Sequence, residues 1–191
     1  MRFNSAMRTA VSIGLMSVLA ACGGGGGGDN ADEAPDTLAA PNSVVILDKG
    51  NSSVQNSTYA LPASSSMAYQ GASGVQSIGD LLLIVSQDAA FETILIYAGN
   101  DHRKYVVGLF DLAGNSYGCR SRNFSTAELQ TLANRVNVGP VGNLGICNKT
   151  VTVNHTGRQA SYANLTLPAD DGTRNRITLS ADFAWPIPLT N

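Results

Sequence analysis

The segment 177–185 places the tightest restriction on what this chain can fold into, because apolar and polar residues alternate along it. Its apolar members are Ile177, Leu179, Ala181, Phe183 and Trp185, and the polar residues among them are Thr178, Ser180 and Asp182. Successive side chains of a β-strand point to opposite faces, so the pattern predicts a strand with one buried and one solvated face. Trp185 is therefore expected in the core.

Further strands are predicted by short runs that are rich in β-branched and aromatic residues and bounded by turn residues. These runs are 43–47, 81–85, 91–98, 104–110, 147–153 and 160–167. We expect them to form two antiparallel meanders in an α+β domain that is mostly antiparallel β and either barrel-like or sandwich-like. The polar stretch 48–77 shows no pattern beyond an extended segment at 58–61.

The segment 125–136 is predicted to be an amphipathic helix. Ser125 and Glu128 occupy the N-cap and N3 positions of a capping box, in which each side chain bonds to the backbone of the other residue. The apolar residues that recur at helical spacing are Leu129, Leu132, Ala133 and Val136. We expect this apolar face to pack against the sheet.

The N-terminal end carries a signal of a different kind. Arg2 and Arg8 precede a short apolar run over 10–21, which ends in Leu19-Ala20-Ala21-Cys22 and is followed by six glycines. A positive start, a short apolar region and small residues before a cleavage point are typical of a signal peptide. The alternatives are a transmembrane helix, which needs about 20 apolar residues, and a secretory leader without lipid.

This stretch resembles the signal peptide and lipobox of bacterial lipoproteins. The resemblance implies that residues 1–21 are cleaved and that Cys22 is acylated. Gly23 in the next position implies, by the same resemblance, the bacterial outer membrane, with the protein facing the periplasm or the cell surface. The segment 22–41 has few apolar residues and is expected to be a flexible Gly-rich tether. The segment 42–191 is expected to be one β-rich globular domain, in which we recognise no family.

Cys119 and Cys147 are the two cysteines of the expected domain, and export would place them in an oxidising compartment where such a pair usually bridges. The alternatives are a zinc site, which needs further Cys or His ligands close by, and a redox pair, which favours a C-x-x-C spacing. Neither pattern is present, so we expect a disulfide that ties the helix to the sheet.

Residues that carry chemistry are sparse in this sequence. His102 and His155 lie in expected turns after different strands. With Asp101 they could bind a metal or form an acid–base pair, but solvated turn histidines are the simpler interpretation. We therefore predict no catalytic residue, no metal ligand and no cofactor.

Four basic residues near strand ends form a candidate anion-binding patch if the strands pair as expected: Arg103, Lys104, Arg120 and Arg122. The alternative is that they are solvated strand ends with no shared role.

Charge and composition bear on the class of function. The chain has 12 basic and 14 acidic residues, and from residue 42 onward the two signs are balanced at 10 each. Such a chain has no basic surplus to recruit nucleic acid. We expect an envelope lipoprotein that is held to the membrane by its N-terminal lipid, with a non-catalytic binding or structural domain for an envelope protein or polysaccharide. The alternative is a hydrolase-like envelope enzyme with a site assembled from scattered residues.

Processing at Cys22 is the first testable expectation. In the membrane fraction, the intact mass should correspond to the chain from Cys22 onward plus acyl chains, because the lipobox directs cleavage before this residue. The Cys22→Ser variant should be released from the membrane or stall before cleavage. A folded, membrane-bound protein that still begins with Met1 would contradict the expectation.

Overall fold

The computed structural model describes residues 36–73, 76–98, 103–136 and 144–190. The expected signal peptide, the lipidation at Cys22 and most of the expected tether lie outside these residues, as does His102. The described chain forms two β-sheets, one α-helix and one short 3-10 helix, η1 (Ala63–Ser65).

The first sheet has five strands, and every neighbouring pair in it is antiparallel. In spatial order its strands are β2 (Thr58–Ala60), β1 (Ser43–Asp48), β11 (Arg176–Ala184), β10 (Gln159–Pro168) and β9 (Thr152–Asn154). The first strand of the domain, β1, therefore pairs directly with β11, which is one of its last.

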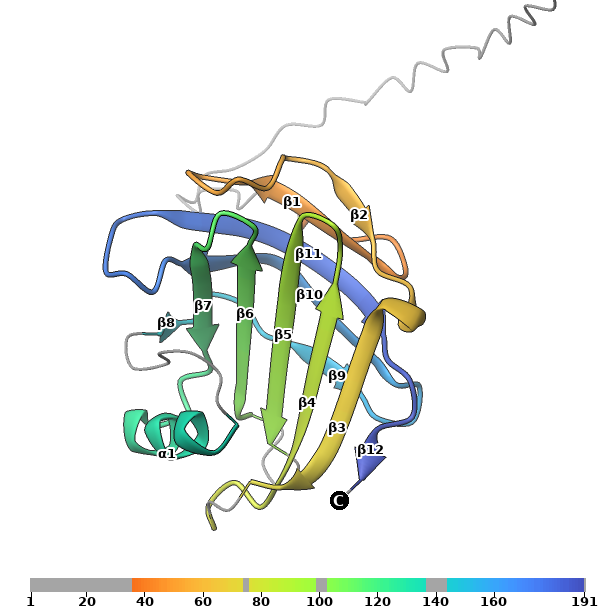
Figure 1. Cartoon of the computed structure of the whole chain (residues 1–191), viewed down its shortest axis with the longest axis vertical. Helices are drawn as coiled ribbons and strands as arrows, with labels where there is room; N and C mark the ends of the chain where they lie inside the picture. The colour runs from red at the N-terminus through yellow and green to blue at the C-terminus, as the bar shows by residue number, and fades with distance from the viewer. Residues whose placement is uncertain (1–35, 74–75, 99–102, 137–143, 191) are drawn as a thin grey trace, which may run out of the picture. The chain divides into compact units, whose positions relative to one another are not determined.

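The second sheet has seven strands, of which the inner pairs are antiparallel and the two end pairs are parallel. In spatial order its strands are β12 (Leu189–Thr190), β3 (Ser66–Ala72), β4 (Asp80–Gln87), β5 (Phe91–Ala98), β6 (Tyr105–Asp111), β7 (Ser116–Arg120) and β8 (Gly145–Ile146). Figure 1 shows this sheet in front of the five-stranded sheet.

The domain is mostly β and sandwich-like, and the sheets do not close into a barrel, which confirms the expected fold class. The alternating segment is β11, and Ile177, Leu179 and Phe183 from it are at most 1% exposed. They join a core that also contains Leu95 and Val107 of the seven-stranded sheet. Trp185, just beyond β11, is 2% exposed and belongs to the same core, as its place in the alternation predicted.

One strand expected from the sequence is wrong in detail. The run 147–153 contains only β9 at its end, and residues 147–151 form no strand. The side chain of Asn148 replaces part of the missing ladder, because its Oδ1 accepts the backbone N–H of Thr166 at 2.8 Å. The stretch 48–77, which showed little pattern, supplies β2, η1 and β3.

The helix α1 (Thr126–Val136) begins with the predicted capping box. The N–H of Ser125 donates to Glu128 Oε2 at 2.9 Å, and the N–H of Glu128 donates to Ser125 Oγ at 3.2 Å. Leu129 and Leu132, each 1% exposed, pack in a second apolar cluster with side chains of the seven-stranded sheet, including Ile96. Ile96 alternates along β5 with Leu95 of the inter-sheet core, so the helix covers the opposite face of this sheet.

Glu128 also links the helix to the sheet edge. Its Oε1 is 2.9 Å from Lys104 Nζ and accepts a hydrogen bond from Ser77 Oγ. Burial alone would raise the pKa of Glu128, but the hydrogen bonds from Ser77, Lys104 and Ser125 outweigh it and lower the pKa to about 2.

A disulfide joins Cys119, at the inner face of β7, to Cys147, directly after β8. The bond spans a sequence separation of 28 residues that includes α1. It therefore fixes the return of the chain from the helix to the end of the sheet.

The lowered pKa of Glu128 predicts a pH-dependent contribution to stability. The carboxylate stabilises the fold fully above its unfolded pKa of about 4.3, and this contribution is lost as the pH falls through about 2. The Glu128→Gln variant should be destabilised by about 1 kcal/mol at pH 7. Urea unfolding at several pH values should show the difference from wild type shrinking between about pH 4.5 and pH 2. A difference that does not change over this range would contradict the assignment.

Removal of the disulfide should destabilise the domain without abolishing the fold, because the core between the sheets contains many apolar side chains besides Cys119. Closing a loop of this length stabilises by about 3–4 kcal/mol in the chain-entropy model. The double variant Cys119→Ser and Cys147→Ser should therefore melt roughly 6–16 °C lower than the oxidised wild type, as measured by calorimetry. An unchanged melting temperature would show that the bridge carries no such restraint.

Candidate functional site

A pocket of about 310 Å³ opens where three segments of the chain meet beside the disulfide. The segments lie at the start of β6, after β7 and after β8. The described residues that line the pocket are Arg103, Tyr105, Ser121, Arg122, Asn123, Ile146, Cys147, Asn148, Lys149 and Thr150. We call this space the Arg122 pocket.

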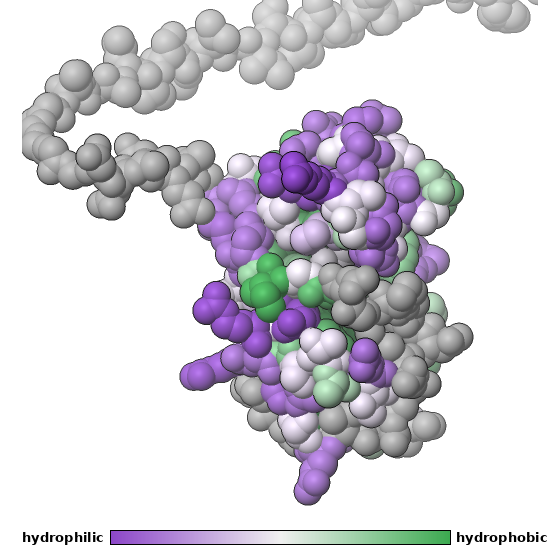
Figure 2. Space-filling view, turned by 90° about the vertical axis from the view of Figure 1, so that its left-hand side faces the viewer, coloured by the Kyte–Doolittle hydropathy of each residue, from purple (hydrophilic) through white to green (hydrophobic). Residues whose placement is uncertain are grey.

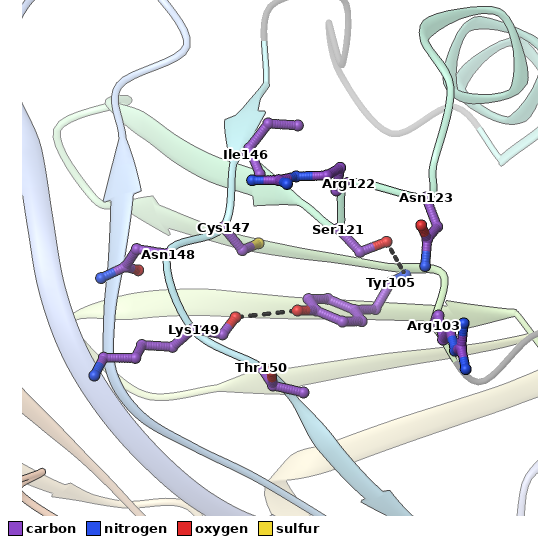
Figure 3. Close-up of a pocket in the computed structure, with 10 residues that line it drawn as sticks. All are labelled: Arg103, Tyr105, Ser121, Arg122, Asn123, Ile146, Cys147, Asn148, Lys149 and Thr150. Carbon is purple, nitrogen blue, oxygen red and sulfur yellow. Dashed lines mark hydrogen bonds between the residues drawn. The ribbon is translucent and has the colours of Figure 1, made fainter.

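Tyr105, at the start of β6, is bonded to both of the other segments that line the Arg122 pocket, the one after β7 and the one after β8. Its hydroxyl donates to the backbone oxygen of Lys149 at 3.0 Å, and its N–H donates to Ser121 Oγ at 3.2 Å (Figure 3). Burial raises the pKa of the Tyr105 phenol above its usual value, so the hydroxyl stays protonated and remains a donor.

The third wall, residues 146–150, is fixed by covalent and hydrogen bonds. The disulfide holds Cys147 to β7, and the N–H of Cys147 donates to the backbone oxygen of Arg120 at 2.9 Å. The side chain of Asn148 is fixed on β10 through Thr166. The backbone around the pocket is therefore set by contacts that do not involve any ligand.

The charge of the lining is of one sign. Arg103, Arg122 and Lys149 are basic, and none of the described lining residues is an aspartate or a glutamate. In Figure 3, Arg122 extends over the pocket beside Ile146, Arg103 lies at the opposite end near Asn123, and the Lys149 side chain runs away from the Tyr105 ring. Hydroxyl and amide groups lie between these cations, so the lining suits a hydrated anionic group.

The surroundings of the pocket are polar as well. Figure 2 shows the side of the domain that faces left in Figure 1, where β7, β8 and α1 lie. Where described residues form this face it is mostly hydrophilic, with small hydrophobic areas among them. Ile146, a lining residue, is 44% exposed.

The structure brings together only two of the four basic residues of the candidate patch. Arg103 and Arg122 line the pocket, whereas Lys104 pairs with Glu128 and Arg120 Nη1 donates to the backbone oxygen of Phe124 at 2.6 Å. These latter contacts hold the helix start in place. Their residues are therefore assigned to structural roles.

Lys149 is a site residue that the sequence reasoning missed. It lies two positions after Cys147, on the segment that the disulfide brings beside β7. Since the pairing of Cys119 with Cys147 was expected, basic residues flanking both cysteines could have been grouped from the sequence. Proximity to a paired cysteine is the signal that identifies Lys149.

Of the three residues in the histidine hypothesis, Asp101 and His102 lie outside the described residues. The ring of His155 lies 5.3 Å from the ring of Tyr97, centroid to centroid. Across the described residues there is no group of three or more His, Cys, Asp or Glu side chains that could hold a metal ion.

No helix in the described ranges is long and apolar enough to cross a membrane.

Comparisons of the chain with protein families, with curated proteins and with solved structures give no match.

Proposed function

We propose that this protein is a membrane-anchored envelope lipoprotein whose domain acts by binding, and that the Arg122 pocket holds an anionic group of its partner. The anchor is the lipid expected on Cys22. The single observation that carries the binding site is a pocket lined by Arg103 and Arg122, with the backbone of Lys149 in its wall and no carboxylate in its described lining.

A local surplus of positive charge is notable in a domain whose charges balance from residue 42 onward. Like charges that lie close together repel each other, and a bound anion would reduce the free energy that this repulsion costs. Arg103 and Arg122 can each present several N–H donors to a carboxylate or phosphate oxygen. Two arginines that line one opening are therefore consistent with recognition of an anion.

The neutral part of the lining favours an acidic polysaccharide as the partner. Ser121, Asn123 and Thr150 offer hydroxyl and amide groups, and Tyr105 offers an aromatic ring. Such groups bond well to the hydroxyls of a sugar, whereas a tightly bound protein partner favours a more apolar centre. An envelope protein with an exposed acidic segment is the alternative partner.

Tethering makes modest affinity sufficient. A domain held close to the membrane by a flexible segment has a high effective concentration against any partner fixed in the same layer. A pocket open to water, with contacts that are largely electrostatic, fits a partner held in this way.

Catalysis requires different groups from those found in the pocket. General acid–base work needs a titratable pair within hydrogen-bond reach of the reacting atom. In the described lining, Cys147 is bonded in the disulfide and the Tyr105 phenol stays protonated. A binding role uses the arginine and lysine side chains as they are, so we propose it ahead of the enzyme.

The pocket can be tested with a carboxylated sugar. The purified full chain should bind an oligogalacturonate in calorimetric titration at low salt and should bind a neutral oligoglucan of equal length much more weakly. The Arg122→Ala variant should weaken oligogalacturonate binding about tenfold, because a charge-assisted hydrogen bond is lost. Arg174→Ala removes an equal charge from the exposed turn between β10 and β11 and serves as the matched control.

The outcomes separate the candidate partners. Binding of inorganic phosphate but not of oligogalacturonate would keep the anion site and exclude a carboxylated sugar. Equal losses in Arg122→Ala and Arg174→Ala would show that net charge, and not the pocket, governs binding. If His102→Ala or His155→Ala abolishes complementation of a deletion strain while stability is unchanged, the enzyme alternative replaces this proposal.

A further inference from the structure

The segment that leads into the domain is bonded to the five-stranded sheet and to one residue of the Arg122 pocket wall. Residues before β1 contact the five-stranded sheet, since Thr37 N–H donates to Asn164 Oδ1 at 3.1 Å and Ser180 Oγ donates to the Thr37 backbone oxygen. Asn164 Nδ2 in turn donates to Asp36 Oδ1 at 3.0 Å. These bonds fix Asp36 at a defined place beside β10.

Asp36 there forms an ion pair with a lining residue of the pocket. The Lys149 Nζ lies 3.0 Å from Asp36 Oδ1. In Figure 3 the side chain of Lys149 runs away from Tyr105, while its backbone oxygen accepts the Tyr105 hydroxyl. The backbone of Lys149 thus belongs to the pocket wall, and its ammonium is held at the entry segment.

The pair is accessible enough to exchange partners. The side chains of Lys149 and Asp36 are 23% and 44% exposed. Partly exposed ion pairs contribute little to stability and are screened by salt. A lysine side chain has four rotatable bonds, so its ammonium can turn to another anion without movement of the backbone.

We propose that Asp36 is a built-in competitor for the Arg122 pocket: it holds the Lys149 ammonium away from the bound anion, and an anion that recruits Lys149 loosens the entry segment. This inference rests on the proposed anion-binding function of the pocket. Because linkage is reciprocal, the entry segment weakens anion binding by the same factor by which a bound anion weakens the docking of the segment.

The coupling has a physical use at a membrane. When the pocket is empty, the contacts of Asp36 and Thr37 keep the end of the tether against the domain. When the pocket is filled, release of these contacts lengthens the free tether. The domain then reaches further from its anchor while the partner is bound.

The central variant is Asp36→Asn, tested in the full chain. Asparagine keeps an oxygen that can accept the Asn164 amide and removes the charge that attracts Lys149. Calorimetric titration with oligogalacturonate at low salt should give about two- to fivefold tighter binding than wild type, the range for a partly exposed ion pair. Lys149→Met keeps the apolar stem of the side chain, and in its background Asp36→Asn should have no effect.

The matched control is Asp88→Asn, which makes the same change in net charge. Asp88 lies in the turn between β4 and β5, next to the end of β5 that pairs with Asp111, whereas Tyr105 pairs with Tyr97 near the other end. This variant should change oligogalacturonate affinity much less than Asp36→Asn does. If Asp36→Asn and Asp88→Asn raise oligogalacturonate affinity equally, the gain comes from net charge alone, and the proposal is overturned.

A second readout follows the entry segment itself. In wild type, titration with oligogalacturonate should shift the backbone amide resonance of Thr37, and in Lys149→Met this shift should be absent. If wild type binds and Arg122→Ala weakens binding, but Asp36→Asn has no effect and Thr37 does not respond, the competition is refuted while the anion site stands. If wild type binds neither oligogalacturonate nor phosphate, the site and the competition both fail.

Discussion

The apolar layer between the two sheets is the interaction on which the rest of the domain depends. Each sheet has one face that water would destabilise, and burying it against the other face stabilises by roughly 25 cal/mol for each Å² removed from water. β11 supplies one side of this layer through Ile177, Leu179 and Phe183, and β5 and β6 supply the other. The helix, the disulfide and the Arg122 pocket all lie around this layer and take their positions from it.

A buried carboxylate ties the polar stretch after β1 to this framework. Asp111, at the end of β6, accepts the Ser52 hydroxyl and the Ser53 N–H, each at 2.9 Å, and the N–H of Asn115 at 2.9 Å. Burial alone would raise the pKa of Asp111, but the hydrogen bonds from Asn115, Ser53 and Ser52 lower it well below its usual value. Residues without an apolar pattern are thus positioned by one ionised side chain.

Local signals were sufficient to predict the fold class and several of its elements, and long-range contacts decided what was missed. The alternation in β11 and the capping box of α1 are encoded by near neighbours. β3 was missed because its inner face carries Ser66, whose hydroxyl lies 2.7 Å from that of Ser86, in place of an apolar residue. Of the candidate patch, Arg103 and Arg122 share a pocket, but the pairing of Lys104 with Glu128 depends on tertiary packing that the sequence pattern does not carry.

The pairing of β1 with β11 also sets the order in which the domain can assemble. Ser43 lies opposite Asp182, so the five-stranded sheet cannot form until nearly the whole chain is available. Contacts this distant along the chain close slowly, because a large loop loses entropy before the pairing compensates for it. Until β10 and β11 have been synthesised, the inner face of the seven-stranded sheet lacks the apolar side chains that cover it in the folded domain. The layer between the two sheets is therefore completed only after β11, near the end of the chain, has been synthesised.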